Sequence, residues 1–480
     1  MSIQDSNQGQ SLYAARIPIF PRRVKGTFRT LKWWIMGVTL AIYYLTPWIR
    51  WDRGPAMPDQ AVLVDLANRR FFFFWIEIWP QQFIYVAGLL IMAGLGLFLF
   101  TSALGRVWCG YTCPQTVWTD LFITVERWIE GDRNARVRLH QQKWDARKAR
   151  LRATKWLVWL LIAVATGGAW VFYFADAPSL LVDLFTGQAP FVAYASVGVL
   201  TATTFVFGGF MREQVCIYMC PWPRIQAAMM DDKTITVGYR HWRGEPRGKH
   251  RKKNADAGLG DCIDCNACVA VCPMGIDIRD GQQLACITCA LCIDACDDVM
   301  EKVGKPRGLI DYVTLQDEAI ETQGAQPIPL IKRILRPRTI LYFVMWAGIG
   351  LGIVVSLFMR DSIDLTVARD RNPTFVVLSD GSIRNGYTIK VANQNQEPHD
   401  FVLSFRSDLP LTAEIQGLEW LEFEVEADKL RQMRLFLTTL PFARPTERAE
   451  VEIWIEDLET RERVAVDTFF LAPEPGDWGP

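Results

Sequence analysis

The sequence reads CIDCNACVAVCP at residues 262–273 and CITCALCIDACD at residues 286–297. Each stretch spaces four cysteines as C-x2-C-x2-C-x3-C, and together they hold eight of the twelve cysteines in the chain. Three thiolates on one tight turn can reach three corners of an iron–sulfur cube, and the fourth corner needs a segment that arrives from elsewhere. The spacing therefore predicts two 4Fe–4S clusters, in which the last cysteine of each run serves the other cluster.

The two predicted clusters have separate sets of ligands. The first set is Cys262, Cys265, Cys268 and Cys296, and the second is Cys272, Cys286, Cys289 and Cys292. Structural zinc is the competing interpretation because C-x2-C is also a zinc-knuckle spacing, but zinc rarely takes a 2-2-3 spacing twice. Pro273 follows the first run, as in bacterial two-cluster ferredoxins, whereas Asp297 replaces that proline after the second run. We therefore expect a protein that carries electrons one at a time.

Half of the residues are hydrophobic, and five apolar stretches are long enough to cross a bilayer as helices. The first stretch starts late and has no small-residue cleavage site, so we do not expect a signal peptide. All four histidines lie outside the stretches, which excludes a membrane haem with paired histidine ligands. The predicted spans are residues 31–49, 83–104, 156–174, 191–210 and 339–359.

Charge predicts the orientation of these spans. Basic segments precede the first span and follow the second and the fourth, which places the N-terminus and both cysteine runs in the cytoplasm. We interpret these basic segments as membrane anchors, so nucleic acid is not an expected partner. Five spans leave the C-terminal segment outside, and residues 361–480 contain 12 Lys and Arg against 23 Asp and Glu. All cysteines then lie on the side where thiols stay reduced.

The C-terminal segment has the pattern of a β-sandwich. Short alternating or β-branched runs are separated by turn residues, with strong turn signals at Asp380-Gly381 and Asn385-Gly386. About seven strands fit an immunoglobulin-like sandwich without its disulfide. We expect His399 to be a loop residue and the domain to be a binding module without catalytic residues.

The predicted fold is a polytopic α-helical membrane protein with five spans, a cytoplasmic two-cluster ferredoxin insert and a C-terminal immunoglobulin-like sandwich. Its predicted parts are a cytoplasmic tail (1–30), a four-span membrane domain (31–240), a cytoplasmic ferredoxin domain (241–335), a fifth transmembrane helix (339–359) and a periplasmic immunoglobulin-like domain (360–480).

The other four cysteines form a second repeated motif. The sequence reads CGYTCP at residues 109–114 and CIYMCP at residues 216–221, just beyond the cytoplasmic ends of the second and fourth spans. Positions i and i+4 share one side of a helix, so each motif should present two sulfur atoms together, and each proline should end or kink its helix. The four thiols, Cys109, Cys113, Cys216 and Cys220, could serve one site.

Spacing alone leaves the ligand of this site open. Soft thiolates select Cu(I), zinc or an iron–sulfur cluster, and Met219 adds a thioether nearby. A third cluster and a redox-active dithiol are the alternatives to copper. Ordinary buried cysteines would explain one such motif better than two.

The paired C-x3-C-P motifs, the two ferredoxin runs, the fifth span and the strand-rich tail together resemble the CcoG/FixG/RdxA family, accessory proteins of cbb-type cytochrome c oxidase. The segment FFFFWIEIWP at residues 71–80 also resembles this family. The resemblance implies a cupric reductase of the bacterial inner membrane that converts Cu(II) to Cu(I) for the oxidase. It assigns Cys109, Cys113, Cys216 and Cys220 to the copper site.

Two other functions compete with copper reduction. The inner half of the chain also resembles quinol-oxidising subunits of nitrate reductase systems, so a quinol-oxidising electron-transfer subunit is one alternative. The other is an assembly scaffold that senses redox state. We expect two 4Fe–4S clusters as cofactors and copper as substrate or bound ion. The expected partners are membrane lipid, copper-transport proteins and oxidase assembly proteins, while the electron donor and the oligomeric state stay open.

Overall fold

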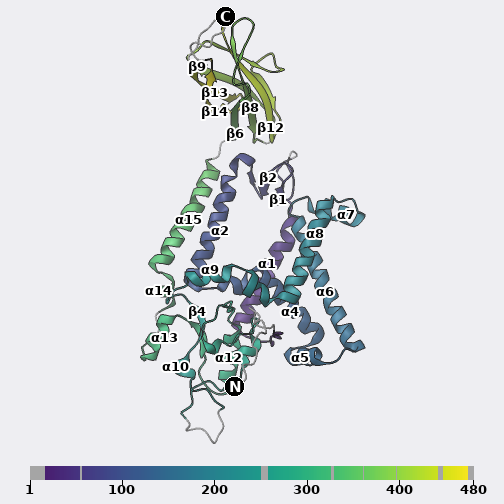
Figure 1. The fold of residues 1–480 in the computed structure, drawn as a ribbon, viewed down its shortest axis with the longest axis vertical. Coiled ribbons are helices and arrows are strands. Elements are labelled where there is room, and N and C mark those ends of the chain that lie inside the picture. The colour runs from purple at the N-terminus through teal and green to yellow at the C-terminus, as the bar shows by residue number, and fades with distance from the viewer. Residues whose placement is uncertain are drawn as a thin grey trace, which may run out of the picture. The chain divides into compact units, whose positions relative to one another are not determined.

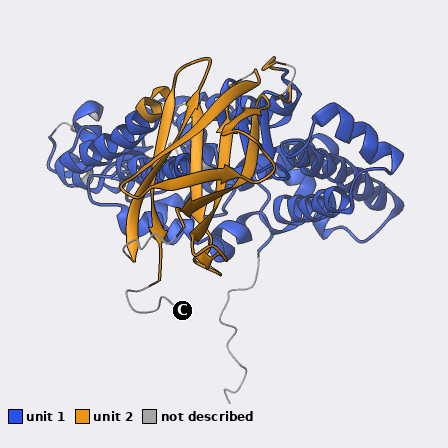
Figure 2. Ribbon diagram, turned by 90° about the horizontal axis from the view of Figure 1, so that it is seen from above, with its two compact units in different colours: residues 1–50, 60–353 blue, residues 51–59, 354–480 orange. Residues whose placement is uncertain are grey.

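The structure is a computed structural model that describes residues 17–54, 57–249, 258–325, 329–359, 362–395, 397–441 and 447–473. It divides into two compact units (Figure 2). Unit 1 contains residues 1–50 and 60–353, and unit 2 contains residues 51–59 and 354–480. Each unit has its own hydrophobic core.

Long apolar helices form one part of unit 1 (Figure 1). Four helical segments in the described part of the chain are long and apolar enough to cross a membrane: α2 (Ile84–Leu104), α6 (Ala146–Val171), α8 with its π-helical extension η3 (Phe191–Thr204 and Phe205–Met211), and α15 (Pro337–Phe358). They overlap the second to fifth predicted spans.

Small residues let these helices approach one another, as is common between membrane helices. A Cβ on Gly88 of α2 would lie 2.8 Å from the side chain of Ile353, so α2 and α15 are in close contact. A Cβ on Gly167 of α6 would lie 2.8 Å from the carbonyl oxygen of Val197 in α8.

The first predicted span behaves differently from the other four. Helix α1 (Thr27–Leu45) starts earlier than expected, and its first turns bury the charged side chains of Arg29 and Lys32. A short 3₁₀ helix, η1 (Thr46–Trp48), follows it. Since α1 is not among the four segments above, the five-span topology stays a prediction.

Apart from α4, the elements that connect the long helices of unit 1 are short. Near the ends of the long helices lie a three-stranded antiparallel sheet and several connecting helices: β1 (Val62–Asp65), β2 (Arg70–Phe73), β3 (Ile76–Ile78), η2 (Pro80–Gln82), α3 (Val107–Tyr111), α4 (Pro114–Glu130), α5 (Arg133–Gln141), α7 (Ala177–Thr186), η4 (Val215–Met219) and α9 (Trp222–Met229).

The ferredoxin region packs around a core that includes Cys262, Cys268 and Cys296. It lies at the α9 end of the long helices, opposite the β1–β3 sheet (Figure 1). Its elements are β4 (Thr236–Tyr239), α10 (His241–Gly244), α11 (Ala267–Val271), η6 (Ile278–Asp280), α12 (Leu291–Lys302), β5 (Ile310–Val313), α13 (Leu315–Thr322) and α14 (Leu330–Ile334), with β4 antiparallel to β5.

Unit 2 is the predicted β-sandwich. One sheet has the order β10-β12-β8-β6, with β7 also paired to β8, and the other has the order β11-β9-β13-β14. Its described strands are β6 (Ile363–Arg369), β7 (Val376–Val377), β8 (Ile383–Asn393), β9 (His399–Ser407), β10 (Leu411–Ile415), β11 (Glu422–Val425), β12 (Lys429–Thr439), β13 (Arg448–Asp457) and β14 (Arg463–Leu471). Alternate residues of β8 and β12 face a buried core, as expected for a sandwich.

Two predictions for this unit were wrong. Asn385-Gly386 is not a turn but lies inside β8, because the Asn385 side chain exchanges two hydrogen bonds with the backbone of Leu471. His399 is not a loop residue. It begins β9, is buried, and its Nδ1 lies 2.6 Å from the Asp457 carboxylate.

Candidate functional site

The first predicted set of cluster ligands comes together at the start of α11 and on α12. Burial is the main reason why the pKa of the Cys296 thiol rises to about 12, and Cys268 makes the next contribution. The remaining neighbours that raise this pKa are Asp297, Cys265 and Cys262. Thus Cys296, from the second run, faces the three leading cysteines of the first run.

The second set comes together in the same crossed manner. Burial raises the pKa of the Cys272 thiol to about 12, with Cys289 the next contributor and Cys286 a further one. Burial also raises the pKa of the Cys292 thiol well above its usual value, with further contributions from Cys289, Cys286, Cys272 and, last, Cys268 of the first set. All four of these cysteines line one small cavity, together with apolar side chains such as those of Ile276 and Leu291.

The backbone repeats the same unusual conformation in both runs. Asp264 and Asn266 in the first run and Thr288 and Ala290 in the second have φ between 54° and 58°, at equivalent positions between the cysteines. A left-handed conformation is unfavourable for residues with a Cβ, and most of all for a β-branched residue such as Thr288. Such strain persists where the surroundings require it, often at functional sites.

These observations fit 4Fe–4S clusters better than a single zinc ion. Among the described residues, no three His, Cys, Asp or Glu side chains converge on one metal position. A structural zinc site needs four converging ligands, whereas a cube binds each thiolate through a different iron. The largely apolar cavity is lined by all four thiols of the second set, with Cys268 of the first set also on its wall, and these residues fit the second cube.

The two C-x3-C-P motifs adopt broken helical conformations. Cys109 lies in α3, whereas Cys113 is the N-cap of α4 and Pro114 is the first residue of that helix. Cys216 lies in the π-helix η4, Cys220 follows it, and α9 begins after Pro221. The expected breaks at the prolines are present, but neither motif is one continuous α-helix with cysteines at i and i+4.

The structure nevertheless gathers all four motif thiols. Burial raises the pKa of the Cys216 thiol to about 12, and Cys113, Cys109 and Cys220 each add to the shift. The Cys109 thiol donates a hydrogen bond to Oε1 of the buried Gln226, over 3.1 Å. Burial also raises the pKa of the Cys109 thiol, to about 11, so a metal ion would have to displace protons from Cys109 and Cys216 to bind them.

The membrane motifs pack directly against the ferredoxin region. Cys109 and Cys216 contact the apolar cluster that contains Ile287 and Cys289. Gly110 fits this contact because a Cβ there would lie 2.6 Å from the carbonyl oxygen of Ile287 and 3.0 Å from Cα of Cys289. Cys109 and Cys216 of the motifs therefore share one core with Cys272, Cys289 and Cys292 of the second predicted ligand set.

Arg106 lies between these two groups of thiols. Its side chain is 4% exposed, and it donates a hydrogen bond to the carbonyl oxygen of Leu284. Burial raises the pKa values of Cys109 and Cys286, and the Arg106 charge acts in the opposite direction on both. No carboxylate among the described residues forms an ion pair with it, so its electrostatic partners are the thiols.

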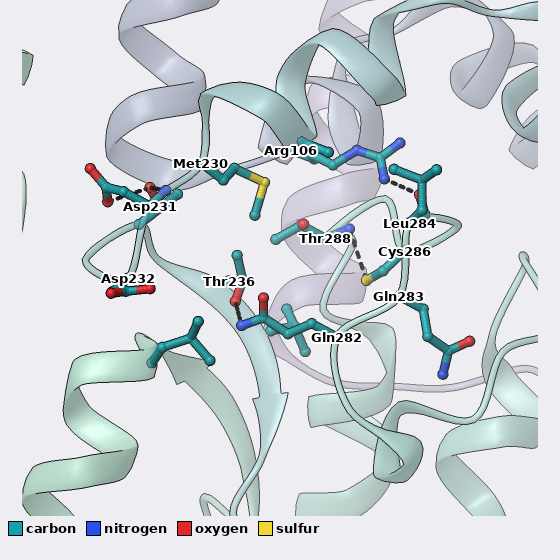
Figure 3. A pocket seen from close by; sticks show the side chains of 14 residues that line it. Arg106, Met230, Asp231, Asp232, Thr236, Gln282, Gln283, Leu284, Cys286 and Thr288 are labelled. Atoms are coloured by element: carbon teal, nitrogen blue, oxygen red, sulfur yellow. Dashed lines mark hydrogen bonds between the residues drawn. The ribbon is translucent and has the colours of Figure 1, made fainter.

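Arg106 also lines a pocket (Figure 3). Met230, Thr236 and Gln282 line it and Cys286 reaches its wall, so it extends to a predicted cluster ligand. The Gln282 amide donates a 2.7 Å hydrogen bond to the Thr236 hydroxyl. Asp231 and Asp232 lie at the edge of the same pocket.

Helix α4 carries charged groups that the sequence analysis missed. Asp120, Glu126 and Glu130 are buried and form ion pairs with basic side chains from α1, α5, α6 and the segment after η3. Glu126 alone contacts three cations: Arg136 at 2.9 Å, Lys155 at 3.1 Å and Arg212 at 3.1 Å. The sequence pattern that could have predicted these ion pairs is three acidic residues on one helix that lies between basic segments.

Family models match three parts of the chain. The model described as a 4Fe-4S dicluster domain matches residues 211–315, and the one described as a 4Fe-4S binding domain matches residues 86–133. A third, described as the IG-like fold at the C-terminal of FixG, matches residues 353–473 and classes FixG provisionally as an oxidoreductase.

The chain is also similar to three curated proteins along nearly their whole lengths. It is 62% identical to protein RdxB of Cereibacter sphaeroides over 96% of this chain and 98% of the relative. Protein RdxA of the same organism is 60% identical, covering 93% and 94%. The nitrogen fixation protein FixG of Rhizobium meliloti is 55% identical, covering 96% and 94%. A solved FixG-related structure from Vibrio parahaemolyticus aligns over 23% of this chain and 97% of its own, with 20% identity and a TM-score of 0.21.

Proposed function

The chain belongs to the FixG/RdxA family of iron–sulfur oxidoreductases, and from this premise we propose that it reduces Cu(II) to Cu(I) in the membrane. The substrate would bind at the thiols of Cys109, Cys113, Cys216 and Cys220. The product would pass to copper-transport and assembly proteins that supply a cbb-type cytochrome c oxidase.

The observation that carries this proposal is the contact between the two groups of cysteines. Cys109 and Cys216 pack in the same apolar cluster as Cys289, and Gly110 lets the two backbones touch. Clusters bound at the eight ferredoxin cysteines supply electrons one at a time, and reduction of Cu(II) consumes one electron. A substrate at the motif thiols would therefore lie beside its reductant.

The chemistry of the thiols favours the product. Soft sulfur ligands bind Cu(I) better than Cu(II), so binding at cysteines makes copper easier to reduce. Cu(I) accepts two or three sulfur ligands, so it does not need all four motif thiols. With both motifs present, copper could be bound by sulfur atoms from the Cys109–Cys113 motif and from the Cys216–Cys220 motif together.

The test is a Cu(II) reduction assay on purified protein whose clusters have been reduced. Two double variants, Cys109→Ser with Cys113→Ser and Cys216→Ser with Cys220→Ser, should keep their iron but lose Cu(II) reduction and Cu(I) retention. Thr112→Ala changes the same loop without removing a sulfur atom and should behave as the parent protein does. Normal copper reduction by both double variants would refute the site.

A third iron–sulfur cluster at the motif cysteines is a second candidate. The family model described as a 4Fe-4S binding domain covers Cys109 and Cys113, which favours it. The same double variants separate the two ideas. Copper chemistry leaves about eight iron atoms in each variant, whereas a third cube predicts about twelve in the parent protein and about eight in the variants.

Quinol oxidation remains the third candidate because of the pocket beside Cys286. Its amide and hydroxyl groups, from Gln282 and Thr236, could bind a quinol head group next to a predicted cluster ligand. Reduction of the clusters by a short-chain quinol, with no effect of the motif cysteine variants on that rate, would support this function for the pocket.

A further inference from the structure

A basic cleft lies between the start of α1 and the end of α4, away from both groups of cysteines. Four cations line it: Arg23 and Lys25 from the segment before α1, Arg29 from α1 and Arg127 from α4. Two tryptophans, Trp33 and Trp128, complete its walls. The lining residues of this cleft include no Asp or Glu.

Some guanidinium nitrogens of the cleft have no hydrogen-bond partner in the protein. Arg29 is 5% exposed and donates through Nη1 to Asp120 at 2.9 Å, but its Nη2 is buried with no hydrogen-bond partner. The Nε of Arg127 is likewise buried without a partner. Burial, reinforced by the charges of Arg136 and Arg29, lowers the pKa of Arg127 to about 10, although the carboxylates of Asp120 and Asp132 act in the opposite direction. An anion in the cleft would relieve this excess of positive charge.

The surface next to the cleft is apolar and exposed. Thr30 lines the cleft, and Trp34, Val38 and Ile42 continue the same stripe of α1 at four-residue spacing. These three side chains are 72%, 54% and 60% exposed. Helix α1 itself lies beside a candidate membrane span, because its Tyr43 donates a 2.7 Å hydrogen bond to the Thr166 carbonyl of α6.

Aromatic residues at the cleft support a position at the membrane surface. Trp128 is 83% exposed and Trp33 is 41% exposed, although both are large and hydrophobic. Tryptophan is enriched where hydrocarbon meets head groups, and basic pockets at helix ends bind anionic head groups. The cleft thus offers charge for a phosphate and an adjoining apolar stripe for acyl chains.

We propose that this cleft is a specific site for an anionic phospholipid, with its phosphate among Arg23, Lys25, Arg29 and Arg127 and its acyl chains along the exposed stripe of α1. This site is independent of the copper proposal. It would hold α1, whose first turn contacts α12 of the ferredoxin region through Asp294, at a fixed depth in the membrane.

The test is lipid binding to delipidated protein in detergent, measured by native mass spectrometry. Phosphatidylglycerol should bind, and phosphatidylcholine with the same acyl chains should bind far more weakly. Arg23→Gln with Lys25→Gln removes two exposed cations from the cleft and should weaken phosphatidylglycerol binding about 30-fold. Lys143→Gln with Arg147→Gln removes two exposed cations from outside the cleft and should leave binding unchanged.

A competitor without acyl chains distinguishes a lipid phosphate from a free phosphate compound in the cleft. Glycerol phosphate at millimolar concentration should not displace phosphatidylglycerol, because it lacks the acyl chains. Displacement by glycerol phosphate would overturn the lipid assignment and leave a small-anion site. Equal binding by the cleft variant and the control variant, or equal binding of the two lipids, would refute the site itself.

Discussion

The hydroxyl group of Tyr111, within the first C-x3-C-P motif, donates a 3.2 Å hydrogen bond to the backbone carbonyl of Cys289 in the second ferredoxin run. The two residues are 178 positions apart in the sequence. Burial is the main reason why the pKa of Tyr111 rises to about 12, so the hydroxyl stays a donor at physiological pH. This bond fixes the membrane motif to the segment that holds the second set of predicted cluster ligands.

The close approach at Gly110 gives the first prediction. A Cβ at this position would lie 2.6 Å from the Ile287 carbonyl oxygen, so Gly110→Ala must push the motif away from the second ferredoxin run. Iron content should stay normal, while the rate of Cu(II) reduction should fall by roughly 10- to 100-fold because the reacting groups are displaced. Stopped-flow mixing of reduced protein with Cu(II) measures this rate.

Gly168→Ala is the matched control for that substitution. Gly168 lies in α6, and a Cβ there would meet no atom within 4 Å. Both variants make the same chemical change in a helical segment, so only the contact with Ile287 distinguishes them. Equal rates for the two variants would show that the contact does not matter for electron transfer.

The crossed arrangement of ligands gives the second prediction. Cys272 belongs to the first run in sequence, but its sulfur faces Cys289 and Cys286 of the second run. Cys272→Ser should therefore damage the cluster of the second run and leave the other intact, with iron falling from about eight atoms to about four. Electron paramagnetic resonance of the reduced protein distinguishes the two clusters. Loss of only the first run's cluster would contradict the crossed assignment.

The sequence was sufficient for features set by local pattern. The spacing of the cysteines predicted the two crossed groups that the structure gathers, and the apolar stretches predicted four of the long helices. The strand-rich tail was predicted as a sandwich because alternation along a strand is a local signal. The family models support 4Fe-4S domains in this chain, whereas the assignment of each cysteine to a cluster stays a prediction.

Features that depend on distant partners could not be predicted. Asn385-Gly386 has the sequence of a turn, but a partner in β14 holds it inside β8. The burial of the charged Glu126 side chain depends on ion pairs with Arg136 of α5, Lys155 of α6 and Arg212 after η3. The sequence around Gly110 does not predict the contact between Gly110 and Ile287. In each case the deciding contact joins residues far apart in the chain.

Membrane topology gives the third prediction. In the five-span model, in which α1 is the first span and α15 the fifth, an alkaline phosphatase fused after residue 480 should be active, and one fused after residue 301 should be inactive. Phosphatase folds only outside the cytoplasm because it needs disulfides. Equal activity of the two fusions would refute the five-span model, because in it α15 places the ferredoxin region and the C-terminal domain on opposite sides of the membrane.

Arg106 gives the fourth prediction. This buried cation stands between Cys109 and Cys286, and reduction adds negative charge nearby. Arg106→Gln should therefore lower the reduction potential of the second cluster by tens of millivolts, while Arg106→Lys should restore most of it. Redox titration followed by electron paramagnetic resonance measures both. Arg224→Gln removes an exposed cation from α9 and should cause little change.

The last prediction concerns acid sensitivity. Burial alone would raise the pKa of Glu126, but Arg212, Lys155 and Arg136 outweigh it and lower the pKa to about 2. The folded pKa is thus below the unfolded value of about 4.5, so the stabilising contribution is complete above pH 5 and is lost as pH falls towards 2. Glu126→Gln leaves buried cations without their partner and should cost about 3–5 kcal/mol at pH 7.

The difference in thermal stability between the parent protein and Glu126→Gln should therefore stay constant from pH 7 to pH 5 and shrink below pH 5. Tryptophan fluorescence during heating measures it at each pH. Glu301→Gln removes an exposed carboxylate paired with Arg307 and should cost less than about 1 kcal/mol throughout. If the deficit of Glu126→Gln were as small as that of Glu301→Gln at pH 7, the buried ion pairs of α4 would not support the fold.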